Sequence, residues 1–347
     1  MHIEPSSFSP RRAILAILVV AGALASARPA AGQGAPPEAY RLVDTRSAAP
    51  QPRAAGELTA PAGIDVAADG THYVADRGAS TVHVLSPAGA GLRVIGQPGD
   101  GFGAFDSPSD VDIDAGRLFV ADTGNRRVQV LDAATGDFVA AWTGLGTPSG
   151  IAVAPDRVYV SDAARGVVTV ADRGGARLAE WRADASGEEP FQRPAGLSVD
   201  PDGNLYVADH GYCYVHVLCP EGHVLARLDR RVSGIDYRPA DVASDASAAY
   251  TLAPRQLAAF DDPVTRAGRN WRFGAYLFGG AGIALGPGAG LTYAVHDTRL
   301  RQSGVVHVAD RATLTAAAEA WVGLPVAEGA LDGPRRVAAA TGSAYLL

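Results

Sequence analysis

The sequence predicts an all-β fold, a β-propeller of four-stranded antiparallel blades. A motif that opens with proline or glycine and runs into a short apolar strand recurs seven times along the 347 residues. It starts at Pro61, Pro108, Pro148, Pro194, Pro239, Gly280 and Pro334, so successive starts are 47, 40, 46, 45, 41 and 54 residues apart. A period of roughly 40–50 residues holds four short strands and their turns, which is one propeller blade.

The first four repeats contain two further strand-like blocks. The second block ends in aspartate, as in 118–122, and the third alternates apolar and polar residues, as in 127–131. Alternation by twos is typical of strands with two different faces. We interpret the recurring aspartates as acceptors for backbone N–H groups of the following turn, because every blade needs such a turn. They are Asp76, Asp122, Asp162 and Asp209.

Two segments resemble NHL repeats. The run GQPGDGFGAFDSP at 96–108 is similar to the glycine-rich approach of such a repeat, and VADTGNRRVQV at 120–130 is similar to its core. The resemblance extends from about Pro61 to Asp229, and beyond that only the strand pattern remains. It implies a propeller that commonly has six blades, whereas the seven repeat starts favour seven. A propeller of six blades therefore remains the alternative to one of seven blades.

The expected domain organisation follows from the ends of the repeats. Residues 61–347 form the propeller, and residues 33–60 form an N-terminal segment with one or two closing strands. The last repeat supplies only two strands, 336–340 and 343–347, which would leave an open edge. Strand-like stretches at 40–44 and 54–59 are available to cover it, so we expect the N-terminus to complete this C-terminal blade.

Residues 1–32 are expected to be a signal peptide. Arg11 and Arg12 precede an apolar run from 13 to 25, and small residues at 25–27 and 30–32 offer cleavage sites. The run is shorter than the roughly 20 residues of a membrane-spanning helix. We therefore expect an extracytoplasmic protein, periplasmic or secreted, with no membrane insertion after cleavage. All 30 basic residues are arginine, and with the abundant alanine this suggests a GC-rich bacterial genome.

Cysteine spacing argues against a disulfide. Cys213 and Cys219 bracket a single predicted strand, 214–218, which separates their Cα atoms by about 20 Å at ~3.3 Å per residue. A disulfide needs Cα atoms within about 7 Å. We expect two unpaired, largely buried thiols.

Composition and missing ligands weigh against several enzyme classes. Without lysine there is no Schiff-base chemistry. Peptidyl-hydroxyglycine lyases, which share the repeat, take zinc-binding histidines from the position after the repeat start, and no histidine stands there in this chain. The family of gluconolactonases is similar around 148–156 and 194–196, but Ser149 and Ala195 replace two metal ligands. A net charge of −7 without a basic stripe disfavours nucleic acid.

An acidic set near the expected channel mouth is the remaining candidate for a ligand site. Asp65 and Asp112 hold the same strand position in consecutive blades, and Asp110 and Asp241 replace glycine at two repeat starts. Arg335 could supply the opposite charge. These five residues are our candidate ligand-binding residues, for a cation or a basic group. The alternative interpretation is a hydrated channel rim, where carboxylates cost little.

The function we expect is non-catalytic recognition. A propeller can vary its loops independently of its blades, so one face is expected to bind a protein, peptide or glycan. We expect a monomer with no cofactor, no metal and no catalytic residues. The alternative is a metal-dependent lyase or hydrolase, similar to the peptidyl-hydroxyglycine lyases or gluconolactonases, with an atypical channel-mouth site.

Overall fold

A computed structural model describes residues 40–44, 55, 57–182, 190–229, 238–253, 256–261, 263–264, 271–276, 280–287, 290–297, 302–308, 337–340 and 343–346. The expected signal peptide, 1–32, lies outside the described residues, as does most of the segment 33–60. The chain divides into two units, 1–37 and 38–347, and the strands of the fold belong to the second. Within the described residues, no helix has the length and apolar character to cross a membrane.

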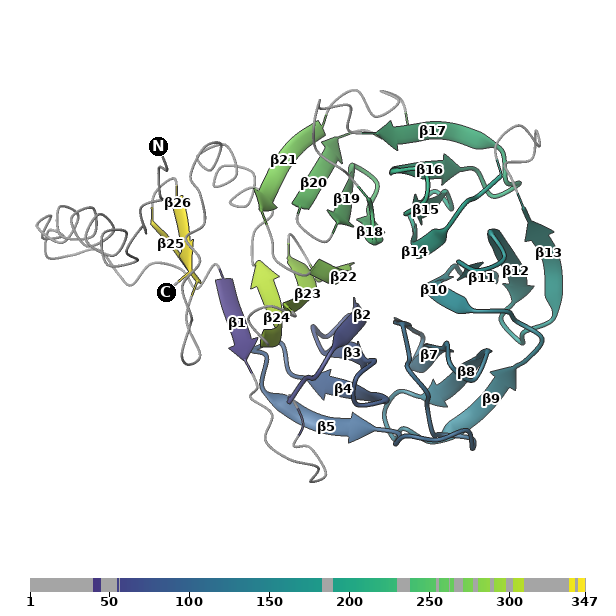
Figure 1. Cartoon of the computed structure of the whole chain (residues 1–347), viewed down its shortest axis with the longest axis horizontal. Helices are drawn as coiled ribbons and strands as arrows, with labels where there is room; N and C mark the ends of the chain where they lie inside the picture. The colour runs from purple at the N-terminus through teal and green to yellow at the C-terminus, as the bar shows by residue number, and fades with distance from the viewer. Residues whose placement is uncertain are drawn as a thin grey trace, which may run out of the picture. The chain divides into compact units, whose positions relative to one another are not determined.

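The described strands form six four-stranded antiparallel sheets arranged as blades around an axis (Figure 1). Blade 1 contains β2 (Pro61–Val66), β3 (His72–Asp76), β4 (Thr81–Leu85) and β5 (Gly91–Ile95). Blade 2 contains β6 (Asp110–Asp114), β7 (Arg117–Asp122), β8 (Arg127–Asp132) and β9 (Phe138–Trp142). Blade 3 contains β10 (Pro148–Val153), β11 (Arg157–Asp162), β12 (Val167–Asp172) and β13 (Arg177–Trp181).

The second half of the ring repeats this arrangement. Blade 4 contains β14 (Pro194–Val199), β15 (Leu205–Asp209), β16 (Tyr214–Leu218) and β17 (Val224–Asp229). Blade 5 contains β18 (Asp241–Ser244), β19 (Ala248–Ala253), β20 (Gln256–Asp261) and β21 (Trp271–Tyr276). Blade 6 contains β22 (Gly280–Leu285), β23 (Leu291–Asp297), β24 (Gln302–Val308) and β1 (Tyr40–Asp44). In each blade the strand named first lies innermost (Figure 1).

The N-terminal segment closes the ring, but in a different blade from the one expected. β1 pairs antiparallel with β24, from Tyr40 opposite Val308 to Asp44 opposite Gly304, and so adds the fourth strand to blade 6. The expectation that it joins the strands ending at Leu347 is wrong. Those strands, β25 (Val337–Ala340) and β26 (Ser343–Leu346), pair with each other in a two-stranded sheet. The start at Pro334 is therefore not a seventh blade among the described residues.

The core consists of buried clusters between neighbouring blades, because each strand presents one face to either side. The second strand of blades 1 to 5 places an aromatic side chain against the following blade; these residues are Tyr73, Phe119, Tyr159, Tyr206 and Tyr250. The next residue, such as Val74 or Val120, packs against the preceding blade. One cluster joins Ile64 and Leu85 of blade 1 to Ala294 and Val305 of blade 6. The ring of six is thus sealed by apolar packing.

Neither cysteine forms a disulfide, as expected, and the two lie on either side of β16. They are half-buried rather than largely buried.

Candidate functional site

The innermost strands of all six blades surround an axial cavity of about 200 Å³. Four of the five candidate ligand-binding residues line it: Asp65, Asp110, Asp112 and Asp241. Asp110 and Asp241 are almost fully buried, with 7% and 6% of their surface exposed. The fifth candidate, Arg335, lies outside the described residues. None of the described residues that line the cavity is basic.

Each of these carboxylates joins two blades through backbone hydrogen bonds. Asp110 accepts the N–H of Val111 at 2.9 Å with Oδ1 and the N–H of Ile151, in blade 3, at 2.8 Å with Oδ2. Asp241 bonds Val242 and, in blade 6, Ile283 in the same way, each at 2.8 Å.

The other two carboxylates make the same contact between blades, but they stand two residues further along the innermost strand. Asp65 accepts from Val66 at 2.7 Å and from Ile113 of blade 2 at 2.8 Å. Asp112 accepts from Val153 of blade 3 at 2.9 Å. Through these hydrogen bonds the four side chains tie blades 1 to 2, 2 to 3 and 5 to 6.

The glycines of the repeat start make room for the two most buried carboxylates. Asp110 and Asp241 stand where the other described repeats have Gly63, Gly150, Gly196 and Gly282. A Cβ atom on Gly63 would overlap the Asp110 carboxylate, and one on Gly196 would overlap that of Asp241. Around the ring this position reads Gly, Asp, Gly, Gly, Asp, Gly. The two aspartates therefore come from opposite blades and face each other across the axis.

Burial and mutual repulsion oppose ionisation of this set. Burial raises the pKa of Asp65 from 3.8 to about 6 and that of Asp241 to about 7, although backbone N–H groups pull both downward. Burial also raises the pKa of Asp110 and Asp112 well above the ordinary range, and the charges of Asp241 and Asp65 add to the respective shifts. Shifts of this kind are typical of functional sites and also of buried structural networks.

The position after each repeat start carries interblade hydrogen bonds in blades 2 and 3. The Ser109 hydroxyl donates to the carbonyl oxygen of Ser149 at 2.9 Å, and Ser149 donates to that of Pro194 at 3.1 Å. The histidines lie elsewhere: His83 and His216 are buried beside Asp76 and Asp209, with Nε2 to carboxylate distances of 3.7 and 3.6 Å. No group of three or more His, Cys, Asp or Glu residues is placed to hold a metal in the part of the chain that the structure describes.

Asp76, Asp162 and Asp209, which end second strands, accept backbone N–H groups of the following turn, as the sequence predicts, whereas the backbone donor to Asp122 is Asp106 of the preceding loop. Asp76 binds Gly78 and Ala79 in the following turn, and Asp209 binds Gly211 and Tyr212. They also reach back to the segment that precedes the repeat start. Asp76 accepts from Thr59 and Ala60, and Asp209 accepts from Gln192 and Arg193; these second contacts were not predicted.

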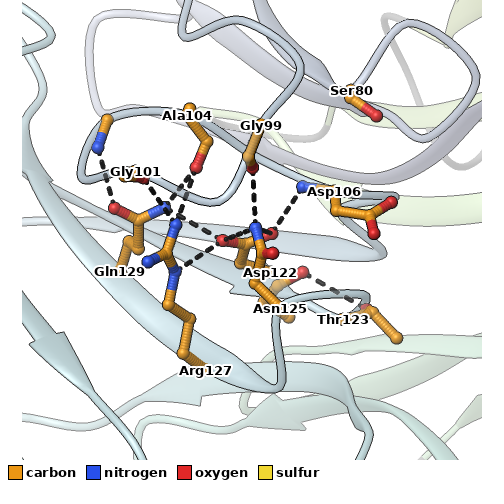
Figure 2. Close-up of polar contacts among 12 residues, drawn as sticks. Ser80, Gly99, Gly101, Ala104, Asp106, Asp122, Thr123, Asn125, Arg127 and Gln129 are labelled. Atoms are coloured by element: carbon orange, nitrogen blue, oxygen red, sulfur yellow. Dashed lines mark hydrogen bonds and ion pairs between the residues drawn. The ribbon is translucent and has the colours of Figure 1, made fainter.

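In blade 2 this contact is expanded into the network of Figure 2. The Asp122 carboxylate accepts from Asn125, from Arg127 Nε at 2.7 Å and from Gln129 Nε2 at 3.0 Å. These three side chains also donate to carbonyl oxygens of the preceding glycine-rich loop, at Gly99, Gly101 and Ala104. Gly103 N–H donates back to Gln129 Oε1 at 2.9 Å. The Asp122 network therefore fixes the loop 97–106 against blade 2.

The loop held in this way presents an aromatic pair that the sequence reasoning missed. Phe102 is 71% exposed and stacks on Phe138 of β9 with ring centroids 4.4 Å apart. The Arg127 guanidinium lies 5.9 Å from the Phe102 ring centroid. Phenylalanine between two glycines, Gly101 and Gly103, was the available signal, because a large apolar residue at a turn has no core to enter.

Comparison with known proteins agrees with this fold. The NHL repeat family model matches residues 105–131 and 191–224. The human and mouse proteins named NHL repeat-containing protein 3 are each 41% identical to this chain over 73 residues, which is 20% of this chain and 21% of theirs. The match thus spans about a fifth of the length of these curated relatives.

Among solved structures, a streptogramin B lyase is 12% identical, with a TM-score of 0.53 over 73% of this chain and 80% of its own. Kuenenia stuttgartiensis hydrazine synthase is 13% identical, with a TM-score of 0.53 over 73% of this chain and 97% of its own. At such identities the likeness shows the fold alone.

The closed ring of four-stranded blades defines this protein as a β-propeller. The segments that match the NHL repeat hold the repeat cores around Asp122 and Asp209.

Proposed function

We propose that this NHL-repeat propeller is a non-catalytic recognition module that binds a protein or peptide through the rim of blade 2. One observation carries the proposal: Phe102, on a loop that the Asp122 network holds in place, is exposed and stacks on the exposed Phe138 of β9. Aromatic anchors supply much of the binding energy of protein interfaces. A loop that is already ordered loses little conformational entropy on binding.

The neighbouring charges favour a partner with an apolar segment flanked by basic groups. Asp100, Asp106 and Asp137 lie within four residues of Phe102 or Phe138 in the sequence and are exposed, and the whole chain carries a net charge of −7. Exposed carboxylates accelerate association with a basic partner more than they add affinity. The location outside the cytoplasm belongs to this proposal and rests on the composition of residues 1–32.

A displayed library of random peptides, selected on the full chain, provides the test. We expect Phe102→Ala and Phe138→Ala to weaken binding of the selected peptides at least tenfold, which is about 1.4 kcal/mol. Leu178→Ala is the matched control, because Leu178 is 60% exposed on the outer strand of blade 3. It should leave the affinity unchanged, and all three variants should keep the parental melting temperature.

Two results would contradict the proposal. Peptides that bind both phenylalanine variants as tightly as the parent would place recognition on another surface. Enrichment on a glycan array without any selected peptide would assign a carbohydrate ligand instead. The metal-dependent alternative has no ligand group within the described part of the chain to support it.

A further inference from the structure

The axial cavity concentrates acidic groups without a basic partner among its lining residues. On the innermost strands every ionisable side chain is an aspartate: Asp65 on β2, Asp110, Asp112 and Asp114 on β6, and Asp241 on β18. β10, β14 and β22 contribute no ionisable group. Among the described residues, Arg173 pairs with Asp114, and its charge also lowers the pKa of Asp112. Its one positive charge is shared and cannot neutralise the set.

The bonding of these carboxylates is compatible with protonation. Asp65, Asp110 and Asp241 each use both oxygens to accept backbone N–H groups from two neighbouring blades. A carboxylic acid can keep accepting at both oxygens and gains an O–H donor. Protonation therefore removes the cost of a buried charge and leaves the bridges between blades in place.

We propose that Asp65, Asp110, Asp112 and Asp241 form a proton-binding ring at the propeller axis, which makes the contacts between blades more stable in acid than at neutral or alkaline pH. The ring is separate from the aromatic pair at the rim and does not depend on the binding function proposed above. In acidic surroundings the ring would therefore increase the stability of the folded propeller.

The sign follows from the protons held by each state. In the unfolded chain these groups ionise near 3.8, whereas burial raises the pKa of Asp65 to about 6 and that of Asp241 to about 7. The native protein keeps protons that the unfolded chain has released. The stabilisation is fully present below pH 3.8 and is lost as the pH rises through 6 and 7.

Thermal and urea unfolding of the full chain across this range test the proposal, with Asp65→Asn and Asp241→Asn as variants. Asparagine offers one acceptor oxygen to two N–H donors, so each variant loses a hydrogen bond at every pH. Only the slope with pH is diagnostic. We expect the parent's advantage over each variant to shrink as the pH rises. For Asp65→Asn the ratio of unfolding constants should change up to about 100-fold, from a shift of about two pKa units.

A control of opposite sign is available in Asp132→Asn. Asp132 accepts the N–H groups of Ala134 and Thr135 in a turn, and these bonds hold the pKa of its exposed carboxyl below the ordinary value. The parent's advantage over this variant should therefore grow as the pH rises to about 3.8 and stay constant above it, where the advantage over Asp65→Asn and Asp241→Asn shrinks.

Carbon-13 NMR of the aspartate carboxyls in the parent tests the ring even if a variant fails to fold. The ring is supported by carboxyl resonances that titrate between about pH 5.5 and 7.5, provided that one of them is missing from the spectrum of Asp65→Asn and another from that of Asp241→Asn. Titration of all aspartates below about pH 5 would overturn it. A rise in melting temperature with calcium at pH 8, absent in Asp241→Asn, would overturn it in favour of a cation site.

Discussion

At the scale of single residues, the same amino acid serves two tasks according to its surroundings. Aspartates at the ends of second strands hold turns and loops in place, whereas aspartates on the innermost strands join neighbouring blades across the axis. The sequence was sufficient to predict both locations, because the repeat register places the first set at strand ends and the second near the channel.

The hydrogen-bond partners of the axial aspartates could not be predicted from the sequence. Asp110 bonds the backbone N–H of Ile151, 41 residues away, and this contact depends on how blades 2 and 3 are shifted relative to each other. No side-chain pattern encodes a backbone donor. The exposed Phe102 was missed for a similar reason, since a search for acids and metal ligands does not weigh an apolar residue in a loop.

Removing the Asp122 carboxylate should be among the most destabilising changes to a polar residue. Asp122 is fully buried and holds Arg127, whose side chain is only 9% exposed, with an Nε to Oδ2 distance of 2.7 Å. Asp122→Ala leaves that guanidinium buried and unpaired, which costs about 3–5 kcal/mol. Asp156→Ala removes the exposed partner of Arg157 and should cost less than about 1 kcal/mol. Urea unfolding measures both, and equal losses would show that the Asp122 network is not structural.

At the scale of strands and blades, the regular repeats were predictable and the closure was not. Motif starts at Pro61, Pro148, Pro194 and Gly280 coincide with the first residues of β2, β10, β14 and β22, because proline and glycine mark where an innermost strand begins. The start at Pro334 also opens with proline, but the strands that follow it form a hairpin and pair with each other. Pairing partners of edge strands depend on which edge is free, and a motif does not carry that information.

Deleting β1 should therefore weaken blade 6. The backbone of Tyr40 to Asp44 pairs with β24 over five residues, so its loss leaves the N–H and C=O groups of that strand unpaired at an exposed edge. We expect a lower melting temperature and concentration-dependent aggregation when 38–44 is removed. Removal of 337–347 is the control, because β25 and β26 share no sheet with a blade. Size-exclusion chromatography and calorimetry measure the two effects, and a larger loss for the C-terminal deletion would refute closure by β1.

At the scale of the whole ring, the boundary between the first and last blades has to be as well packed as the others. A propeller whose blades contact only their neighbours is as stable as its weakest boundary allows. Leu85 and Leu131 occupy equivalent positions in the third strands of blades 1 and 2, and both are fully buried. Leu85 packs in the cluster between blades 6 and 1, and Leu131 in the cluster between blades 1 and 2.

Leu85→Ala and Leu131→Ala should consequently cost similar amounts. A buried leucine replaced by alanine loses about 2–5 kcal/mol, depending on how far the cavity collapses, and the two sites differ only in which boundary they seal. Urea unfolding at one pH gives both values, and an unchanged dependence on urea concentration would confirm that only the native packing was altered. If Leu85→Ala costs less than about 1 kcal/mol while Leu131→Ala costs the full amount, blades 6 and 1 separate before the rest of the ring unfolds. The ring would then open at the boundary where the chain passes from β1, the last strand of blade 6, to β2, the first strand of blade 1.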